Sequence, residues 1–341
     1  MRAIVVSKPK EFGLVTLPQP QCGRSQALIH TAYCGICGTD LEILCGSIGP
    51  DYVRYPIVPG HEWTGVVVEV GHDVRNCTVG DRVSVEGYLN CGSCTHCQAG
   101  ESNLCVSHEQ IGFTHNGGFA EYVLAPARLC HPLPESLDLE EAVLIEPAAT
   151  VVRAVERANP KPGFTGVVIG CGPIGQIALR LLGQYQPSSI LAIDVSVKQQ
   201  ALAIRAGATA FTSNSDVQEI FDKSSGNGWD VVVDCAGGTR AMELALRIVR
   251  RGGNFVAIGG APEHQRVSFP ANIFVMQDLH VDGLFGYTTS SWRRTIELLS
   301  TGKLRLRDLI THRVALAQFE EAVNLVQSRT EPMGKVVVTY A

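Results

Sequence analysis

A two-domain α/β fold is predicted by three features of this sequence. The chain has 341 residues, and at roughly 150 residues per domain this length favours two domains. Near Pro147 the pattern changes from short β-rich runs between turns to strands that alternate with helical segments. A Gly-x-Gly-x-x-Gly motif also follows an apolar strand in the second part. We therefore expect an all-β first domain and a second domain built on a parallel sheet covered by helices.

The composition excludes several classes of protein. Apolar residues make up 45% and charged residues 18%, which is an ordinary globular balance. The net charge of -5 and the pI near 6.1 lack the basic surface of a nucleic-acid binder. No apolar run reaches the roughly 18 residues of a membrane span, and the apolar stretch at the N-terminus is too short for a signal peptide. We expect a cytoplasmic protein with no nucleic-acid or membrane partner.

The first domain is expected to span residues 1–147 and to be barrel-like. Runs at 27–32, 65–70 and 81–85 are rich in β-forming residues and are bounded by Gly, Pro or Asp.

The second domain is expected to span residues 148–287. Its six candidate strands are 167–170, 190–194, 208–212, 231–235, 254–258 and 280–285. Helical patterns separate several of them, as at 174–184, 198–205 and 239–250. Alternation of this kind predicts right-handed βαβ units and a doubly wound dinucleotide fold. The segment 288–341 adds two helices, 292–300 and 316–328, and a final strand, 335–340, which we expect to return to the first domain.

Four of the twelve cysteines lie within 15 residues, in the spacing C-x2-C-x2-C-x7-C. They are Cys91, Cys94, Cys97 and Cys105. Four thiolates on a loop with small residues predict a closed, structural zinc site in a lobe at about 88–106. An iron–sulfur cluster is disfavoured, because its usual run continues with C-x3-C-P and Val106 follows the last cysteine here. Four free thiols in one loop would be prone to oxidation.

The Gly-x-Gly-x-x-Gly motif predicts a site for the pyrophosphate of a dinucleotide. Gly170 makes the tight turn, Gly172 lets the backbone approach the phosphates, and Gly175 allows close packing of helix on strand. Pro173 and Ile174 complete the motif at the start of the helix, whose N–H groups face the phosphates.

Asp194 ends the next strand, 19 residues after Gly175. Its carboxylate is suited to accept hydrogen bonds from the ribose of adenosine and to repel a 2′-phosphate, which favours NAD over NADP. A strand-end Asp that only caps the next helix is the alternative, and Lys198 is the nearest cation that a 2′-phosphate would find.

Candidate ligands of a second metal lie in three separate segments. Cys37 follows Gly35-Ile36, His61 and Glu62 follow Pro59-Gly60, and Glu146 precedes Pro147. Each is weak alone, since a buried Cys is usually an apolar filler and a Glu-Pro pair is usually a loop boundary. The remaining cysteines are expected to be buried fillers. They are Cys22, Cys34, Cys45, Cys77, Cys130, Cys171 and Cys235.

The run Gly60-His61-Glu62-x2-Gly65-x5-Gly71-x2-Val74 resembles the signature of zinc-dependent medium-chain alcohol dehydrogenases. The Gly-Ile-Cys-Gly-Thr-Asp run, the four-cysteine lobe and the glycine motif follow in that family's order, and the resemblance extends from Met1 to Tyr340. The Ile145-Glu146-Pro147 run is similar to the sorbitol, threonine and sugar or cyclitol branch. The resemblance implies a GroES-like catalytic domain and a Rossmann domain.

The resemblance also implies roles for individual residues. Cys37 and His61 would hold a catalytic zinc, and Glu62 and Glu146 would be direct ligands or exchange with water. Asp40 would bond the far nitrogen of His61 and fix its tautomer. Thr39 would hydrogen-bond the substrate hydroxyl and begin the proton relay.

Two positions depart from the family pattern. Many polyol and threonine dehydrogenases have a histidine two residues after the Asp, where this chain has Glu42. Many also have a histidine seven residues after the Glu of Glu-Pro, where this chain has Arg153. We interpret Glu42 as a group that bonds a substrate hydroxyl or passes a proton outward. A surface charge or a distant ion pair is the alternative for both residues.

The resemblance implies an NAD-dependent enzyme with two zinc ions per chain. It would oxidise a secondary alcohol of a small polyol, sugar or cyclitol to a ketone. A 3-hydroxy amino acid such as threonine, or an aminocyclitol, is the alternative substrate, and a non-enzymatic protein on the same fold is a more distant alternative. The family favours a homotetramer, then a dimer.

Overall fold

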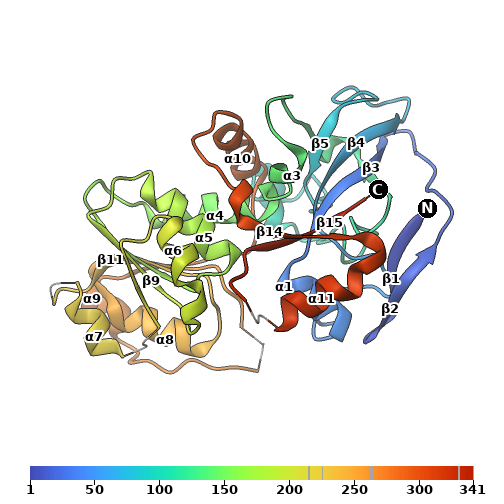
Figure 1. The fold of residues 1–341 in the computed structure, drawn as a ribbon. Helices are drawn as coiled ribbons and strands as arrows, with labels where there is room; N and C mark the ends of the chain where they lie inside the picture. The colour runs from blue at the N-terminus through green and yellow to red at the C-terminus, as the bar shows by residue number, and fades with distance from the viewer. Residues whose placement is uncertain (214–215, 225, 262–263, 329–330, 341) are drawn as a thin grey trace. The chain divides into compact units, whose positions relative to one another are not determined.

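The computed structural model describes residues 1–213, 216–224, 226–261, 264–328 and 331–340. The chain, drawn in Figure 1, divides into two compact units. The first comprises Met1–Pro147, Thr288–Thr330 and Lys335–Ala341, and the second comprises Ala148–Tyr287 and Glu331–Gly334. Within the described residues, no helix is both long enough and apolar enough to cross a membrane.

The first unit is built mainly from strands, as predicted. Its seven-stranded sheet has the order β14-β15-β3-β4-β5-β7, and β6 also pairs with β3. The strands are β3 (Gln26–Gly35), β4 (Glu62–Val70), β5 (Arg82–Val85), β6 (Tyr122–Pro126), β7 (Cys130–Pro132), β14 (Ile310–Ala315) and β15 (Lys335–Thr339). A separate hairpin joins β1 (Arg2–Lys8) to β2 (Glu11–Thr16). The final strand of the chain, β15, pairs antiparallel with β3, although the two are far apart in sequence (Figure 1).

Helices of the first unit occupy the connections between its strands. They are α1 (Gly38–Cys45), α2 (Thr95–Gln98), α3 (Leu139–Ala142), α10 (Thr289–Ser300) and α11 (Phe319–Ser328). Trp292 on α10 is fully buried, and its indole N–H donates to Ser84 Oγ of β5 at 3.2 Å. Burial of so large a side chain with its polar atom paired holds α10 firmly on the sheet.

The predicted doubly wound parallel sheet of the second unit is confirmed. Its order is β10-β9-β8-β11-β12-β13, and every neighbouring pair is parallel. The strands are β8 (Thr165–Ile169), β9 (Ser189–Ile193), β10 (Ala210–Thr212), β11 (Trp229–Asp234), β12 (Val249–Ala257) and β13 (His280–Gly283). Its helices are α4 (Ile145–Ala158, whose first residues belong to the first unit), α5 (Pro173–Gly183), α6 (Gln200–Arg205), α7 (Val217–Asp222), α8 (Thr239–Ile248) and α9 (Ile273–Gln277). The central strands β8, β9 and β11 are largely apolar and buried because helices cover both faces of such a sheet.

The structure differs from the sequence expectations at a few boundaries. The short helices α7 and α9 and the strand β14 were not predicted. The helix expected at 239–250 ends at Ile248, and β12 begins at once with Val249. Val249 and Arg250 continue the helical pattern in sequence, but Val249 pairs with Trp229 of β11, so tertiary pairing overrides the local pattern.

Candidate functional site

The four clustered cysteines converge as the spacing predicts. The sulfurs of Cys91, Cys94, Cys97 and Cys105 all lie within 4.8 Å of one another. The short helix α2 begins directly after Cys94, so one turn of helix turns Cys97 back toward Cys91, and their sulfurs are 3.9 Å apart.

Backbone N–H groups in this lobe point at the sulfurs. Cys91 N donates to Cys105 Sγ at 3.3 Å, and Cys94 N donates to Cys91 Sγ at 3.4 Å. Hydrogen bonds from Ser93, and then from Cys94, lower the pKa of the Cys91 thiol to about 5. Thiolates rather than thiols bind metals, so a four-sulfur set of this kind fits a tetrahedral zinc ion with no open position.

A second cluster of ligand atoms forms where β3 and β4 pair. Atoms of Cys37, His61 and Glu62 lie within 4.8 Å of one another. Gly35 near the end of β3 lies opposite Glu62 at the start of β4, so the antiparallel register brings these two distant segments together. Gly60 has φ of 97°, a conformation that a residue with a side chain rarely adopts, and it directs His61 into the cluster.

Asp40 holds the second cluster in place. Its carboxylate is fully buried and accepts hydrogen bonds from Cys37 N at 2.8 Å and from Gly60 N at 3.2 Å. One of its oxygens lies 3.4 Å from His61 Nδ1. Burial lowers the pKa of His61, but Asp40, followed by Cys37, raises it well above its usual value. The cluster therefore favours a cation, and the Cys, His and carboxylate donors fit zinc with an open position.

Lys335, at the start of β15, was not among the site residues predicted from the sequence. Its ammonium is buried and contacts both carboxylate oxygens of Glu62, at 2.6 and 2.7 Å. It also donates to Ile36 O at 3.3 Å. Burial lowers the pKa of Lys335, but Glu62 and then Cys37 raise it above its usual value. Lys335 is thus a fixed positive charge beside the candidate ligands.

Glu146 lies near the second cluster but is not part of its tight set. It is in the first turn of α4 and is partly buried. Burial raises the pKa of Glu146 to about 7, and the nearby Glu62 and Asp40 add to this effect against the opposing charges of His61 and Lys335. Its carboxylate is therefore influenced by the charges of this cluster. The group of ligand atoms within 4.8 Å of one another consists of Cys37, His61 and Glu62 and does not include Glu146.

Thr39 and Glu42 lie on α1, just after Cys37. Thr39 is half-buried, and its Oγ1 lies 3.6 Å from Cys37 Sγ. Glu42 is exposed, and its side chain makes no hydrogen bond or ion pair with any residue that the structure describes. Thr39 thus lies against a candidate metal ligand, whereas the role expected of Glu42 stays a prediction.

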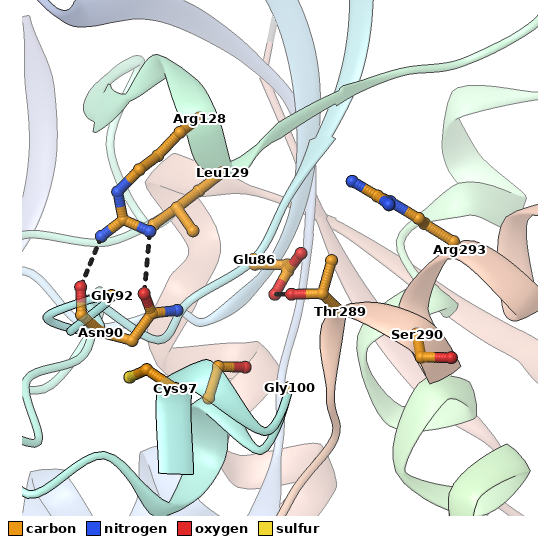
Figure 2. A pocket seen from close by; sticks show the side chains of 11 residues that line it. Glu86, Asn90, Gly92, Cys97, Gly100, Arg128, Leu129, Thr289, Ser290 and Arg293 are labelled. Atoms are coloured by element: carbon orange, nitrogen blue, oxygen red, sulfur yellow. Dashed lines mark hydrogen bonds between the residues drawn. The ribbon is translucent and has the colours of Figure 1, made fainter. Parts of the chain in front are cut away.

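A cavity of about 430 Å³ lies beside the four-cysteine lobe, within the first unit (Figure 2). Cys97 and Arg128 line it, and Arg128 donates to the backbone and side-chain oxygens of Asn90 at 2.7 and 3.1 Å. Figure 2 also shows Thr289 donating to the buried Glu86 at 2.9 Å. None of the side chains of the second cluster lines this cavity, so it is not the candidate catalytic centre.

The glycine motif of the second unit has the geometry expected of a phosphate loop. Gly170 has φ of 89°, and a Cβ on Gly175 would lie only 1.8 Å from Gly170 O. A Cβ on Gly172 would instead meet nothing within 4 Å. Pro173 is the first residue of α5, and Ile174 follows it in the first turn. The loop thus combines close packing at its base with open space where a pyrophosphate would lie.

Asp194 lies at the carboxyl end of β9, beside this loop. Its two oxygens accept hydrogen bonds from Cys171 N at 2.7 Å and from Ser196 N at 2.8 Å. Each carboxylate oxygen can accept a second hydrogen bond, so these contacts orient the group without using up its capacity.

The other cysteines are not all fillers. Cys34, Cys77, Cys130 and Cys171 are buried as predicted, while Cys22 and Cys235 are partly exposed. The prediction is wrong for Cys45, which is exposed at the end of α1 with its sulfur 3.3 Å from Ser47 Oγ. The sequence alone does not show this, because Cys45 directly follows the buried Ile43 and Leu44, and only its position on the helix leaves it exposed.

Comparison with known proteins relates both units to one family. The profile described as "Alcohol dehydrogenase GroES-like domain" matches residues 23–135, and that described as "Zinc-binding dehydrogenase" matches residues 173–301. The chain is 32% identical over 345 residues to the sorbitol dehydrogenase of Bacillus subtilis, covering 99% of this chain and 97% of that protein. It is 32% identical over 307 residues to the D-xylulose reductase A of Aspergillus niger, covering 86% and 84%.

Solved structures agree with these relatives. A zinc-binding dehydrogenase from Sinorhizobium meliloti 1021, bound to NADP, has a TM-score of 0.92 at 30% identity, covering 99% of this chain and 98% of that chain. An alcohol dehydrogenase from Escherichia coli CFT073, complexed with NADH, has a TM-score of 0.92 at 27% identity, covering 99% of both chains. The chain therefore belongs to the zinc-binding alcohol dehydrogenase family, among relatives that act on polyols and sugars.

Proposed function

We propose that this protein is a zinc- and NAD-dependent dehydrogenase that oxidises a secondary alcohol of a polyol, sugar or cyclitol to a ketone. The observation that carries the proposal is the cluster of Cys37, His61 and Glu62 on the framework of this family. The sorbitol dehydrogenase and D-xylulose reductase relatives support a hydroxyl-rich substrate.

Two zinc sites with different roles follow from the two clusters. Cys91, Cys94, Cys97 and Cys105 would hold a structural ion. Cys37 and His61 would hold the catalytic ion, with Glu62 or Glu146 as the exchangeable carboxylate ligand. The first unit would thus provide the catalytic domain and the second the nucleotide-binding domain.

Residues in and around the second cluster would have different roles in the reaction. A zinc ion held there supplies Lewis-acid stabilisation of the substrate oxygen, and bound NAD supplies the hydride acceptor. Thr39 Oγ1 would accept the hydroxyl proton of the substrate while its own hydroxyl proton passes toward solvent. Asp40 keeps the ring of His61 in one orientation through its contact with Nδ1. Loss of one proton and one hydride from the alcohol leaves the ketone.

Glu42 would contribute to substrate specificity. An exposed carboxylate on the helix that carries Thr39 suits a neighbouring substrate hydroxyl better than an alkyl group, because an apolar neighbour would desolvate it without a partner.

The proposed cofactor is NAD, bound by Gly170, Gly172, Pro173, Ile174 and Gly175 through its pyrophosphate. Asp194 would accept hydrogen bonds from the ribose hydroxyls of adenosine and repel a 2′-phosphate. The similar structure complexed with NADH supports this choice. Because another similar structure is bound to NADP, the preference between the two cofactors has to be measured.

A substrate screen tests the proposed function. Reduction of NAD and of NADP is followed at 340 nm with polyols, sugars, cyclitols, 3-hydroxy amino acids and simple alkanols. We expect the largest kcat/KM with NAD and a polyol, sugar or cyclitol. A best substrate among alkanols or hydroxy amino acids, or equal kcat/KM for the two cofactors, contradicts the corresponding part of the proposal.

We also propose that the chain is cytoplasmic and self-associates, as a homotetramer or a dimer. Its free cysteines suit a reducing compartment. Among the residues that the structure describes, no strand pairs with the outer side of β13 at the edge of the second sheet, and Val275, Met276 and Val281 are exposed on α9 and β13. An exposed apolar edge of this kind is suited to a second copy of the chain, and sedimentation gives the subunit count.

A further inference from the structure

Arg153 on α4 binds the backbone just beyond β13. Its Nη1 donates to Phe285 O at 3.1 Å and to Gly286 O at 3.3 Å. Arg157, one helical turn later, pairs with Asp282 of β13 at 3.0 Å. All of these residues belong to the second unit. One face of α4 therefore holds both the strand and the chain that follows it.

The segment 284–287 is fixed at both ends as well. Leu284 N donates to Ala257 O, the last residue of β12, at 2.9 Å, and the ring of Tyr287 is fully buried. Between these anchors Gly286 has φ of 57°, and the Phe285 side chain is 49% exposed. Arg153 thus acts on the part of the segment that lies between these two anchors.

The sheet order shows which half of a dinucleotide this segment would meet. Gly170 and Asp194 lie at the carboxyl ends of β8 and β9, where the pyrophosphate and the adenosine ribose would bind. A dinucleotide crosses such a sheet above these ends, so its other half extends over β11, β12 and β13. The segment 284–287 follows the carboxyl end of β13 and is therefore on the nicotinamide side.

We propose that Arg153 is a positioning residue for the nicotinamide half of NAD. Its guanidinium donates hydrogen bonds to two backbone carbonyls and thereby fixes the segment 284–287 in the conformation that receives the nicotinamide ring. This inference rests on the proposed NAD-dependent function and adds to it a role for Arg153.

Arginine suits this role because one N–H-rich, permanently charged group can satisfy adjacent carbonyls. A neutral side chain of similar length would fill the same space but would lack these two hydrogen bonds. Arg157 provides a matched comparison, because it lies one turn along the same helix and pairs with the side chain of Asp282 in β13.

The test compares NADH with ADP-ribose, which has the adenosine, both riboses and the pyrophosphate but no nicotinamide. Affinities are measured by NADH fluorescence and by competition with ADP-ribose, for the full-length wild-type protein, Arg153→Met, Arg153→Lys and Arg157→Met. For Arg153→Met we expect the Kd of NADH to rise about tenfold while the Kd of ADP-ribose changes less than about twofold. Arg153→Lys should recover part of the NADH affinity, and Arg157→Met should leave the ratio of the two Kd values unchanged.

The outcomes separate this inference from the proposed function. Equal weakening of both ligands by Arg153→Met, or no weakening of NADH, overturns the positioning role while leaving the NAD-dependent function in place. The same selective loss in Arg157→Met would also overturn it, because the effect would then belong to the helix face in general. Wild-type protein that binds neither ligand refutes the proposed function itself.

Discussion

The two candidate metal centres of the first unit differ in their donors and in what surrounds them. The four-cysteine lobe offers only sulfur, on a loop that is largely exposed, and its supporting hydrogen bonds come from neighbouring backbone N–H groups. The second centre mixes sulfur, imidazole and carboxylate, and buried Asp40 and Lys335 support it. A closed shell of thiolates suits a structural role, whereas a mixed shell with buried charges leaves room for a substrate.

The two centres are also assembled differently: one from residues close together in sequence, the other from segments far apart. The lobe is assembled within 15 residues, so short turns alone bring its ligands together. The second centre requires the pairing of β3, β4 and β15, and its ion pair joins residues 273 positions apart in sequence. Stability of the lobe should therefore depend on its own ion, and that of the second centre on the whole sheet.

The largest expected effect is on turnover at the second centre. His61→Ala should reduce kcat by at least about a thousandfold, or about 4 kcal/mol of transition-state stabilisation, because it removes a ligand of the catalytic ion. The fold should remain, as judged by circular dichroism and thermal unfolding. His72→Ala, at an exposed histidine, is the control and should retain full activity. Turnover near the wild-type value in His61→Ala would remove this residue from the catalytic centre.

The next effect is on stability, through Lys335. Lys335→Met leaves Glu62 buried without its partner and should lower the free energy of unfolding by about 3–5 kcal/mol. Denaturant titration measures the change. Lys8→Met removes an exposed pair with Glu11 and should cost less than about 1 kcal/mol. If the two variants lose equal stability, the buried pair is not a special feature of this centre.

The Glu62–Lys335 pair shows how much of the second centre could be predicted from the sequence. Cys37, His61 and Glu62 lie in short motifs with glycine turns, and these motifs with their family resemblance identified them. Lys335 lies in an ordinary apolar strand, and nothing in its neighbours indicates that it will meet Glu62. The signal that could have found it is a lysine directly before a run of three valines in a strand, since such a residue must find a charged partner when buried.

A comparable limit applies to α1. The sequence places Thr39, Asp40 and Glu42 close to Cys37, but only the phase of the helix separates the buried Asp40 from the exposed Glu42. In the second unit the alternating pattern predicts all six parallel strands, because apolar runs of that length between helices have few other places in a fold. The short helices α7 and α9 were missed because five or six residues give too little periodicity to detect.

A smaller loss of stability is expected at the lobe. Cys94→Ser should lower the free energy of unfolding by more than about 2 kcal/mol, because a structural zinc contributes directly to folding. The folded fraction should keep its kcat, which sets this variant apart from His61→Ala. Cys45→Ser, at an exposed cysteine outside both clusters, should change neither quantity. A Cys94→Ser protein of unchanged stability that has lost its turnover would reverse the roles of the two centres.

The smallest effect is expected at Glu42. Glu42→Gln should reduce kcat/KM for the best polyol by about tenfold, or about 1.4 kcal/mol. Glu42→Leu should harm polyols more than simple alkanols, because the carboxylate is expected to bond an additional substrate hydroxyl. Glu320→Gln on α11 serves as the surface control. Unchanged polyol turnover in Glu42→Leu would leave Glu42 as an ordinary surface charge.

Zinc content, measured by elemental analysis on freshly purified protein, tests the central claim most directly. The account predicts two zinc ions per chain in the active wild-type protein and one in each of Cys94→Ser and His61→Ala. It also predicts that only the Cys94→Ser protein remains active with its single ion. An active wild-type protein with one zinc ion or none, or variants that both keep two, would contradict the assignment of two separate centres with different roles.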